Sequence, residues 1–362
     1  MDKFNNRPPL YMRLYSLLKQ RIEAGEWGFG AMLPSENELC EMFRTSRGTI
    51  RQVLAELESE GLVRRERGRG TFVARAGLQR AAPGVHSRSI AFIVPYVRDS
   101  FVSSILLGLE SAARAGGYGI LFNHVENQLE KQAQALRMAV QQGIAGIVLY
   151  PVNSKDACPV LHELILKNAP LVQVDRYVRG LYTDQVTSDN FGGGMIATQH
   201  LLWLGHRRIG FLSWLEPATS MEHRRAGYRQ ALVEAGLLPA PDLEWDVEGY
   251  PDIDEAALEE RLRSADRPSA VFAANDQLAL AVQRVARRLK ISIPGELALV
   301  GFDNLEISAQ LDIPLTTIAQ PAFEIGRTAG ELVLCKIRQE TACIEKRVLP
   351  VQLLVRRSCG ML

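Results

Sequence analysis

The chain has 362 residues, which is too long for one ordinary hydrophobic core, so we expect two or three domains. Apolar residues make up 47% of the sequence and charged residues 23%, which is typical of a soluble globular protein and argues against a disordered or fibrous one. No run approaches about twenty consecutive apolar residues, and the N-terminus lacks the apolar stretch and cleavage site of a signal peptide. We therefore expect a cytoplasmic protein that has no membrane partner.

The cysteines and histidines show no disulfide or metal-binding pattern. The five cysteines are odd in number and include no CxxC pair, so reduced thiols are expected. The six histidines are dispersed, without HExxH or similar spacing. The sequence therefore predicts no metal site and no cofactor.

The formal net charge of +1 conceals an uneven distribution. Residues 1–80 hold 14 Lys and Arg against 10 Asp and Glu, whereas the remainder holds 28 against 31. The basic residues of the first part gather between Arg44 and Arg75. A locally basic small domain joined to a near-neutral body is typical of nucleic-acid binding.

Residues 1–75 carry the pattern of three helices followed by a β-hairpin. Apolar residues at helical spacing predict a helix over 10–24. Ser35 is a favourable N-cap for the next helix, with a glutamate three residues later at the capping-box position. A short break follows, then a third helix is expected over 47–60 and two strands over 62–74. This order predicts a winged helix-turn-helix domain, an α+β fold.

The second helix of a helix-turn-helix meets base edges in the major groove with its first turn. Here that turn is rich in hydroxyl and arginine side chains, which suit phosphates and guanine edges. The tip of the predicted hairpin is basic and glycine-rich, so its backbone can approach DNA closely. The predicted DNA contacts are Ser35, Arg44, Ser46, Arg47, Gly48, Thr49, Arg51, Arg67, Arg69 and Gly70. The alternative is that these arginines form an ordinary solvated face.

The segment LPSENELCEMFRTSRGTIRQVLAELESEGLVRRERGRGTFV resembles the DNA-binding domain of the gntR family. The resemblance extends over about residues 8–74 and implies a winged helix that binds operator DNA. One departure is Gly48, where many members have a larger polar residue. The operator sequence therefore stays open.

Residues 76–88 are small and polar and contain Pro-Gly, which predicts a linker between a domain over 1–75 and one over 89–362. Beyond this linker, apolar runs of strand length alternate with helical patterns, which predicts parallel sheets covered by helices on both faces. The units are too many for one compact sheet, so we expect two Rossmann-like subdomains with a cleft between them. The first subdomain is placed at about 89–187 and 319–345, and the second at about 188–318 and 346–362.

Polar side chains follow several of the apolar runs directly. Asp175 and Arg176 follow PLVQV, Asn275 follows SAVFAA, and Asp303 follows LALVGF. In open α/β sheets, ligands bind beyond the carboxyl ends of the strands. Carboxylates and amides accept hydroxyl protons and arginine donates to oxygens, so these residue types suit a polyol. The alternative is that each Asp or Asn caps a helix or shapes a turn.

This second part resembles the effector domain of the LacI family, which is similar to periplasmic sugar-binding proteins. The matching motifs are SDNFGGGMIATQHLLWLGHRRIGFL, RRAGYRQAL, VFAANDQLALAV, LALVGFDN and LTTIAQPAFEIGRTA. The resemblance implies that two subdomains close around a small-molecule effector. It suggests effector-binding roles for Asp99 or Phe101, Arg176, Asn190, Arg224, Asn275, Asp303 and Gln320.

A gntR-type DNA-binding domain joined to a LacI-type effector domain resembles the arabinose repressors of Gram-positive bacteria. The pair Asp175-Arg176 departs from them and resembles hexose and ribose regulators, so a pentose, a hexose, a sugar derivative and a nucleoside all stay open. The resemblance implies a repressor that its effector releases from operator DNA. Because one helix-turn-helix reads only a half-site, a homodimer is expected.

Two other functional classes fit parts of the pattern. An enzyme could hold phosphate with the glycine clusters at 68–70 and 192–194, but neither has full GxGxxG or GxxxxGK[ST] spacing, and no GxSxG motif occurs. A secreted sugar carrier would share the large fold but would lack residues 1–75 and would have a signal peptide. We therefore expect a transcriptional regulator with no catalytic residue.

Overall fold

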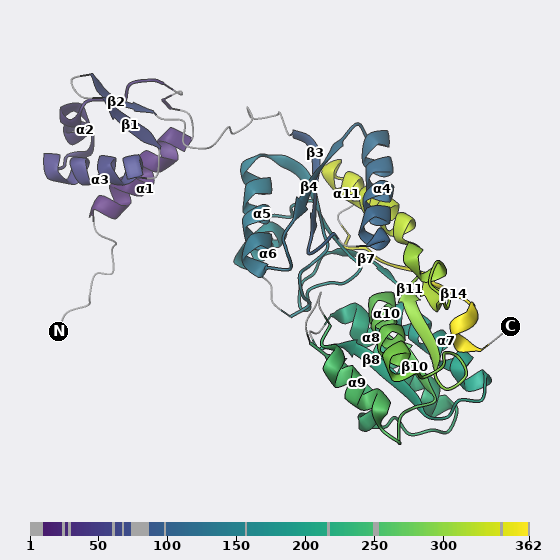
Figure 1. Cartoon of the computed structure of the whole chain (residues 1–362). Helices are drawn as coiled ribbons and strands as arrows, with labels where there is room; N and C mark the ends of the chain where they lie inside the picture. Colours follow the sequence, from purple (N-terminus) through teal and green to yellow (C-terminus); the bar gives the residue numbers. More distant parts are fainter. Residues whose placement is uncertain are drawn as a thin grey trace, which may run out of the picture. The chain divides into compact units, whose positions relative to one another are not determined.

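The chain forms two compact units, the first ending at Val85 and the second beginning at His86 (Figure 1). The computed structural model describes residues 10–23, 26–27, 30–59, 62–66, 69–73, 87–97, 99–155, 158–215, 218–248, 253–340 and 343–360. Most of the predicted linker over 76–88 lies outside the described residues, and its last two residues already belong to a strand of the second unit.

The first unit is a helical core with a two-stranded hairpin. Its elements are α1 (Leu10–Glu23), α2 (Glu36–Phe43), α3 (Arg47–Ser59), β1 (Val63–Glu66) and β2 (Gly70–Val73). The two strands are antiparallel, with Val63 opposite Val73. Leu18, Leu39 and Ile50, one from each helix, are fully buried and form the centre of the core. The predicted winged helix-turn-helix is confirmed.

Short-range hydrogen bonds fix the start of α2 and the turn between α2 and α3. The Ser35 hydroxyl accepts a bond from the Glu38 amide at 3.3 Å, and the Glu38 carboxylate accepts one from the Ser35 amide at 2.7 Å. This is the predicted capping box. The helix ends at Arg44, whose φ of 48° places it in the left-handed region. Just before α3, the Ser46 hydroxyl accepts a bond from the Thr49 amide at 3.2 Å, which gives the first turn of α3 its cap.

The second unit contains two six-stranded sheets, and the first is parallel throughout. Its strands, in spatial order, are β4 (Gly119–His124), β3 (Ser87–Val94), β5 (Ile144–Leu149), β6 (Leu171–Val174), β7 (Asp184–Ser188) and β13 (Lys346–Leu349). Its helices are α4 (Ser100–Ala115), α5 (Leu129–Gln141), α6 (Pro159–Leu166) and α11 (Ala322–Ile337). Along β3, Ile90, Phe92 and Val94 pack with α4 and α11, whereas Ala91 and Ile93 pack with α5 and α6 (Figure 1).

The second sheet has the same layered design. Its strands, in spatial order, are β9 (Glu244–Val247), β8 (Ile209–Trp214), β10 (Ala270–Ala273), β11 (Ala298–Asp303), β12 (Thr316–Ala319) and β14 (Gln352–Leu354). Its helices are α7 (Asn190–Trp203), α8 (Thr219–Glu234), α9 (Glu255–Arg263) and α10 (Asp276–Leu289). All pairings are parallel except β12 with β14. The predicted α/β fold of two parallel-sheet subdomains is confirmed.

Helices α7 and α8 pack so closely that their contact requires glycine. A Cβ atom on Gly194 would lie 2.2 Å from the Arg224 carbonyl oxygen, and one on Gly227 would lie 2.1 Å from the Phe191 carbonyl oxygen. Neither backbone could tolerate such an approach. Gly194, the last glycine of the cluster at 192–194, therefore serves helix packing, and the close packing fixes the position of Arg224.

The chain passes between the two sheets three times, after β7, after β12 and after β13. The last of these crossings differs from the sequence prediction, which returned the chain to the second subdomain at residue 346. Instead, β13 pairs in parallel with β7, with Leu349 opposite Ser188, so the crossing lies after Leu349. The pairing joins residues far apart in the sequence, and the local pattern carries no sign of it.

Candidate functional site

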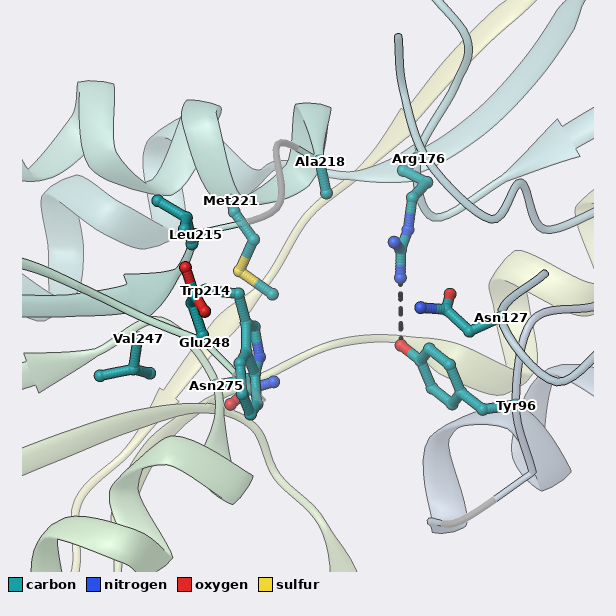
Figure 2. Close-up of a pocket in the computed structure, with 10 residues that line it drawn as sticks. All are labelled: Tyr96, Asn127, Arg176, Trp214, Leu215, Ala218, Met221, Val247, Glu248 and Asn275. Carbon is teal, nitrogen blue, oxygen red and sulfur yellow. Dashed lines mark hydrogen bonds between the residues drawn. The ribbon is translucent and has the colours of Figure 1, made fainter. Parts of the chain in front are cut away.

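A cavity of about 320 Å³ lies between the two sheets of the second unit (Figure 2). Its lining consists of Tyr96, Asn127, Arg176, Trp214, Leu215, Ala218, Met221, Val247, Glu248 and Asn275. Most of these residues follow the carboxyl end of a strand, as the general rule for open α/β sheets requires. Of the predicted effector residues, only Arg176 and Asn275 belong to this lining.

Arg176 is held by the wall from which it extends. Its Nη2 donates to the hydroxyls of Tyr96 at 3.1 Å and Tyr150 at 2.9 Å, and its Nη1 donates to the Val152 carbonyl at 3.2 Å. The guanidinium also stacks on Tyr150, 4.7 Å from the ring centroid. Burial raises the pKa of Tyr96 to about 12, so both hydroxyls stay protonated and can accept the arginine's hydrogen bonds.

Arg224 forms the centre of a buried polar network in the second subdomain. Its Nε donates to the Asn190 amide oxygen at 2.8 Å, and its Nη1 lies 3.3 Å from the Asp303 carboxylate. The Gln320 amide donates to the same Asp303 oxygen at 2.7 Å. The guanidinium also lies 3.6 Å from the centroid of the Phe302 ring. The structure thus brings together four predicted effector residues from four separate segments of the chain.

Desolvation raises the pKa of Asp303 well above its ordinary value, and the Arg224 charge counteracts part of that shift. Asp303 also has a φ of 113°, in a region that non-glycine residues rarely adopt. Asp175, the residue before Arg176, has a φ of 65°. Both strained carboxylates stand at strand ends that face the cleft, as is common where a structure holds side chains for binding.

Two of the remaining predicted effector residues, Asp99 and Asn275, also have structural roles. Asp99 caps α4 by accepting bonds from the amides of Phe101 and Val102, and Asn275 caps α10 through the Leu278 amide. The helix-cap interpretation therefore holds for both residues, although Asn275 also lines the main cavity. Phe101 lies in a second cavity of about 270 Å³, which Asp303 and Gln320 also line.

Sequence reasoning missed several residues of the cleft. Tyr96 and Trp214 come at or just after strand ends, so the rule that found Arg176 could have found them. Tyr150 directly follows β5, so the same rule applies to it, whereas Asn127 in a loop and Met221 on α8 carry no comparable sequence signal.

Contacts between the subdomains border the cavity. The first residue of α8, Thr219, follows Ala218, a residue that offers no side-chain cap. The cap comes instead from the other subdomain, because the Thr219 amide donates to the Ser154 hydroxyl at 2.9 Å. The Tyr177 amide donates to the Thr219 hydroxyl at 3.2 Å. Both hydroxyl residues are buried, at 0% and 2% exposure.

A second cross-cleft contact lies on the same side, where Arg179 forms an ion pair with Glu222. Toward α4, the Gln277 amide donates to Asp99 at 3.0 Å, and the Glu306 amide donates to the Ser100 hydroxyl at 3.1 Å. The two subdomains are therefore joined by hydrogen bonds on either side of the polar network.

In the first unit, the predicted DNA-binding residues divide by their hydrogen bonding. Arg51 pairs with Glu36 at 2.8 Å, and Arg69 pairs with Glu66 at 2.8 Å. By contrast, the exposed guanidinium of Arg47, on the first turn of α3, makes no ion pair with any residue that the structure describes. It is therefore available to a ligand.

Some of the other predicted DNA-binding residues stabilise the local structure, and others are exposed to solvent. Ser35 and Arg44 cap the two ends of α2, and the hydroxyls of Ser46 and Thr49 lie 3.0 Å apart. Gly48 is exposed at the start of α3, and Gly70 begins β2 with a φ of 129°. Arg67 lies outside the described residues.

Within the described part of the chain, no group of three or more His, Cys, Asp or Glu side chains could hold a metal ion. None of the helices described there has the length and apolar character needed to cross a membrane.

Comparisons with known proteins agree with the two units. Residues 10–73 match the bacterial regulatory proteins of the gntR family, and residues 198–359 match the periplasmic binding protein-like domain. The chain is 32% identical over 341 residues to an arabinose metabolism transcriptional repressor of Halalkalibacterium halodurans, covering 90% of each protein.

Two solved structures are similar to this chain over most of its length. The complex of the transcriptional regulator CelR with cellobiose has a TM-score of 0.70 at 25% identity, covering 97% of this chain and 100% of the other. A LacI-family regulator from Enterococcus faecium with bound ribose has a TM-score of 0.66 at 28% identity, covering 76% and 99%. The chain therefore belongs to the bacterial transcriptional repressors that join a gntR-type DNA-binding domain to a LacI-type, periplasmic-binding-protein-like effector domain.

Proposed function

We propose that the protein represses transcription by binding operator DNA through its first unit and that a sugar bound in the cleft of its second unit releases it. The observation that carries this proposal is the cavity at the strand ends between the two sheets, which has an aromatic ring and hydrogen-bonding side chains on both of its sides (Figure 2). The cellobiose and ribose complexes named above support a sugar as the ligand class.

The base contacts with operator DNA would come mainly from the first turn of α3. Arg47 is exposed and without an ion-pair partner among the described residues, so its guanidinium can form a bidentate contact with guanine. Arg51 and Arg69 would exchange their half-buried glutamate partners for phosphates, because ion pairs at the surface contribute little and are easily replaced. A homodimer would place two such units on the halves of a palindromic operator.

Effector response would follow from closure of the two subdomains. The network of Asn190, Arg224 and Asp303 provides polar groups for ligand hydroxyls on one side, and Arg176 with Tyr96 provides them on the other. The segment over 76–88 would transmit the change to the DNA-binding units. Coupling of this kind typically amounts to about 1–3 kcal/mol and is reciprocal, so operator and sugar weaken each other's binding.

Catalysis is not part of this proposal. The glycines at 192–194 lie against the Asp189 side chain, the Phe302 ring and the backbone of α8, in that order, so their tight surroundings leave no phosphate cradle there. A secreted carrier would share the second unit but would have no use for a winged helix. The proposed site of action is the cytoplasm, where the operator is found, with no membrane involved.

The test is operator binding by the full chain, measured by fluorescence anisotropy across salt concentrations with and without sugars. Repression predicts tight binding to its own upstream region that weakens linearly on a log–log plot against salt. It also predicts that at least one sugar weakens that binding. Salt-insensitive or absent DNA binding would favour the carrier or enzyme classes.

A further inference from the structure

Tyr150 lies behind the wall of the main cavity, in the core that the first sheet forms with α4 and α11, and its side chain is 2% exposed. Among the residues that the structure describes, its hydroxyl bonds only to Tyr96, at 2.8 Å, and to Arg176 Nη2, at 2.9 Å. Both partners line the cavity. We propose that Tyr150 is a positioning residue of the effector site, one that fixes Arg176 and Tyr96 for the ligand without touching the ligand itself. This inference rests on the proposed function, since it assigns a role within the same site.

The Tyr150 hydroxyl completes a closed set of three hydrogen bonds. Arg176 Nη2 donates to the oxygens of Tyr150 and Tyr96, and the bond to Tyr96 is drawn in Figure 2. The Tyr150 proton is buried, and its one acceptor among the described residues is the Tyr96 oxygen, so Tyr150 donates to Tyr96. The position of each of these three polar groups therefore depends on the other two.

The Tyr150 ring supports the same guanidinium. Arg176 Cζ lies 4.7 Å from the centroid of the Tyr150 ring and 6.0 Å from that of the Tyr96 ring. The two rings meet edge to face, with their centroids 5.7 Å apart. A long arginine side chain loses much rotational freedom when a ligand orders it. Because Tyr150 orders Arg176 beforehand, the ligand does not bear that entropic cost.

Asp175 competes with the tyrosine hydroxyls for Arg176. Its carboxylate lies 3.5 Å from Arg176 Nε, which makes no hydrogen bond with any described residue. The Asp175 side chain is 4% exposed, so solvent screens its attraction for the guanidinium little. The hydroxyls of Tyr150 and Tyr96 oppose this attraction by holding the Nη end of the guanidinium at the cavity. Without the Tyr150 hydroxyl, the guanidinium would be able to turn toward Asp175.

The backbone that carries Tyr150 is itself held in place. The Tyr150 amide donates to the Ile93 carbonyl at 2.9 Å, which continues the pairing of β5 with β3. Two residues later, the Val152 amide donates to the side-chain oxygen of Gln132 at 2.8 Å, and Gln132 is 1% exposed. The Val152 carbonyl in turn accepts the bond from Arg176 Nη1. One fixed segment therefore holds both Nη atoms of the guanidinium.

Tyr150→Phe in the full chain removes the hydroxyl and keeps the ring, so it tests the hydrogen bonds alone. Tyr228→Phe is the matched control, because Tyr228 is also fully buried and its hydroxyl donates to the Ile209 carbonyl at 2.8 Å. Ile209 begins β8, so this bond lies at the end of the strand opposite the cavity. Each variant loses a buried tyrosine hydroxyl, and urea unfolding should show both to be less stable than the wild type.

The two variants should differ in ligand binding, which a purely structural role of Tyr150 would not explain. Calorimetry with cellobiose, D-ribose and L-arabinose as probes provides the measurement. We expect Tyr150→Phe to bind the sugar that the wild type binds roughly 5- to 30-fold more weakly, and Tyr228→Phe to bind it normally. Wild-type affinity in Tyr150→Phe, or an equal loss of affinity in both variants, overturns the proposal.

A second readout needs no ligand. In a crystal structure of Tyr150→Phe, we expect the Arg176 guanidinium to turn toward Asp175 or to occupy more than one position, whereas in Tyr228→Phe it should stay in place. A single guanidinium position in Tyr150→Phe, still bonded to Val152 and Tyr96, overturns the proposal. If none of the three sugars binds the wild type, that result counts against the proposed sugar effector, and the crystal structures still decide the role of Tyr150.

Discussion

The amide of Thr219 donates a hydrogen bond to the hydroxyl of Ser154 across the cleft, so helix α8 receives its N-cap from the opposite subdomain. An N-cap contributes about 0.5–2 kcal/mol to helix stability. Opening of the cleft would remove this cap from the helix that carries Met221 and Arg224. Closure and the order of the α8 terminus are thus linked through a single pair of residues.

Ser154→Ala should therefore weaken sugar binding. The closed state loses the N-cap that the Ser154 hydroxyl provides to α8 from the other subdomain. The expected cost of about 0.5–2 kcal/mol corresponds to roughly a 2- to 30-fold loss of sugar affinity in a calorimetric titration. Ser103→Ala, which removes an exposed hydroxyl of α4, is the control and should bind normally. Operator affinity without sugar should not change in either variant. Wild-type sugar affinity in Ser154→Ala would mean that the cap does not contribute to closure.

Arg47→Ala should weaken operator binding by about 1–3 kcal/mol, because the exposed guanidinium has no described intramolecular partner and is free for a base edge. Anisotropy measurements at one fixed salt concentration provide the comparison. Arg114→Ala removes an exposed arginine of the second unit and should leave operator affinity intact. Unaltered binding by Arg47→Ala would remove this residue from the contact set.

Arg224→Met should destabilise the second unit by about 3–5 kcal/mol, because it leaves the Asp303 carboxylate buried without its ionic partner. Urea unfolding at pH 8 gives the free energy of unfolding. The double variant Arg224→Met with Asp303→Asn should recover part of the loss, since no uncompensated charge remains. If the single and double variants were equally unstable, lost packing on Phe302 would account for the effect instead of charge.

The fold stability should depend on the ionisation of Asp276. Burial raises the pKa of its carboxyl to about 6 against an ordinary 3.8, even though the hydroxyls of Ser308 and Thr317 donate to it and lower the pKa. The folded state therefore binds this proton more tightly than the unfolded state, and stability falls as pH rises from about 4 to about 6.

Asp276→Asn cannot ionise and should not show this loss. Relative to the wild type, its free energy of unfolding should rise by about 2 kcal/mol between pH 4 and pH 6. Parallel urea titrations across that range measure the difference. A constant offset between the two proteins at every pH would show that Asp276 keeps an ordinary pKa.

Gly194→Ala should destabilise the second unit by roughly 1–3 kcal/mol, because the new methyl group would meet the Arg224 carbonyl 2.2 Å away. Gly48→Ala is a contrasting helical substitution, since its Cβ would have its nearest neighbour at 3.7 Å. It should stabilise the first unit by about 0.5–1 kcal/mol. A tolerated Gly194→Ala would contradict the close contact of α7 and α8.

Features that depend on neighbouring residues could be predicted from the sequence. The capping box of Ser35 and Glu38 follows from a spacing of three residues, and the structure has it. The strand-end rule selected Arg176, Asn275 and Asp303 because an apolar run shows where a parallel strand stops. Their convergence on one cleft is a consequence of parallel topology, which the alternating pattern also indicates.

What the sequence could not show depends on contacts between distant segments. Nothing near Ser154 indicates that its hydroxyl will cap a helix that begins at Thr219. The pairing of β13 with β7 is equally invisible, because Arg347 and Val186 are separated by most of the second unit. The ion pair of Arg224 with Asp303 likewise joins α8 to the end of β11, which lie far apart in the sequence, and no local pattern reports it.

The three crossings between the sheets have a consequence for protein synthesis. The first sheet lacks its edge strand until Leu349 has been made, and the second lacks its own until Leu354, so neither subdomain is complete before these strands are synthesised. The winged helix, in contrast, has all its elements within residues 10–73. A nascent chain can therefore possess a folded DNA reader while its effector-binding part is still unformed, and the two halves of this regulator mature at different times.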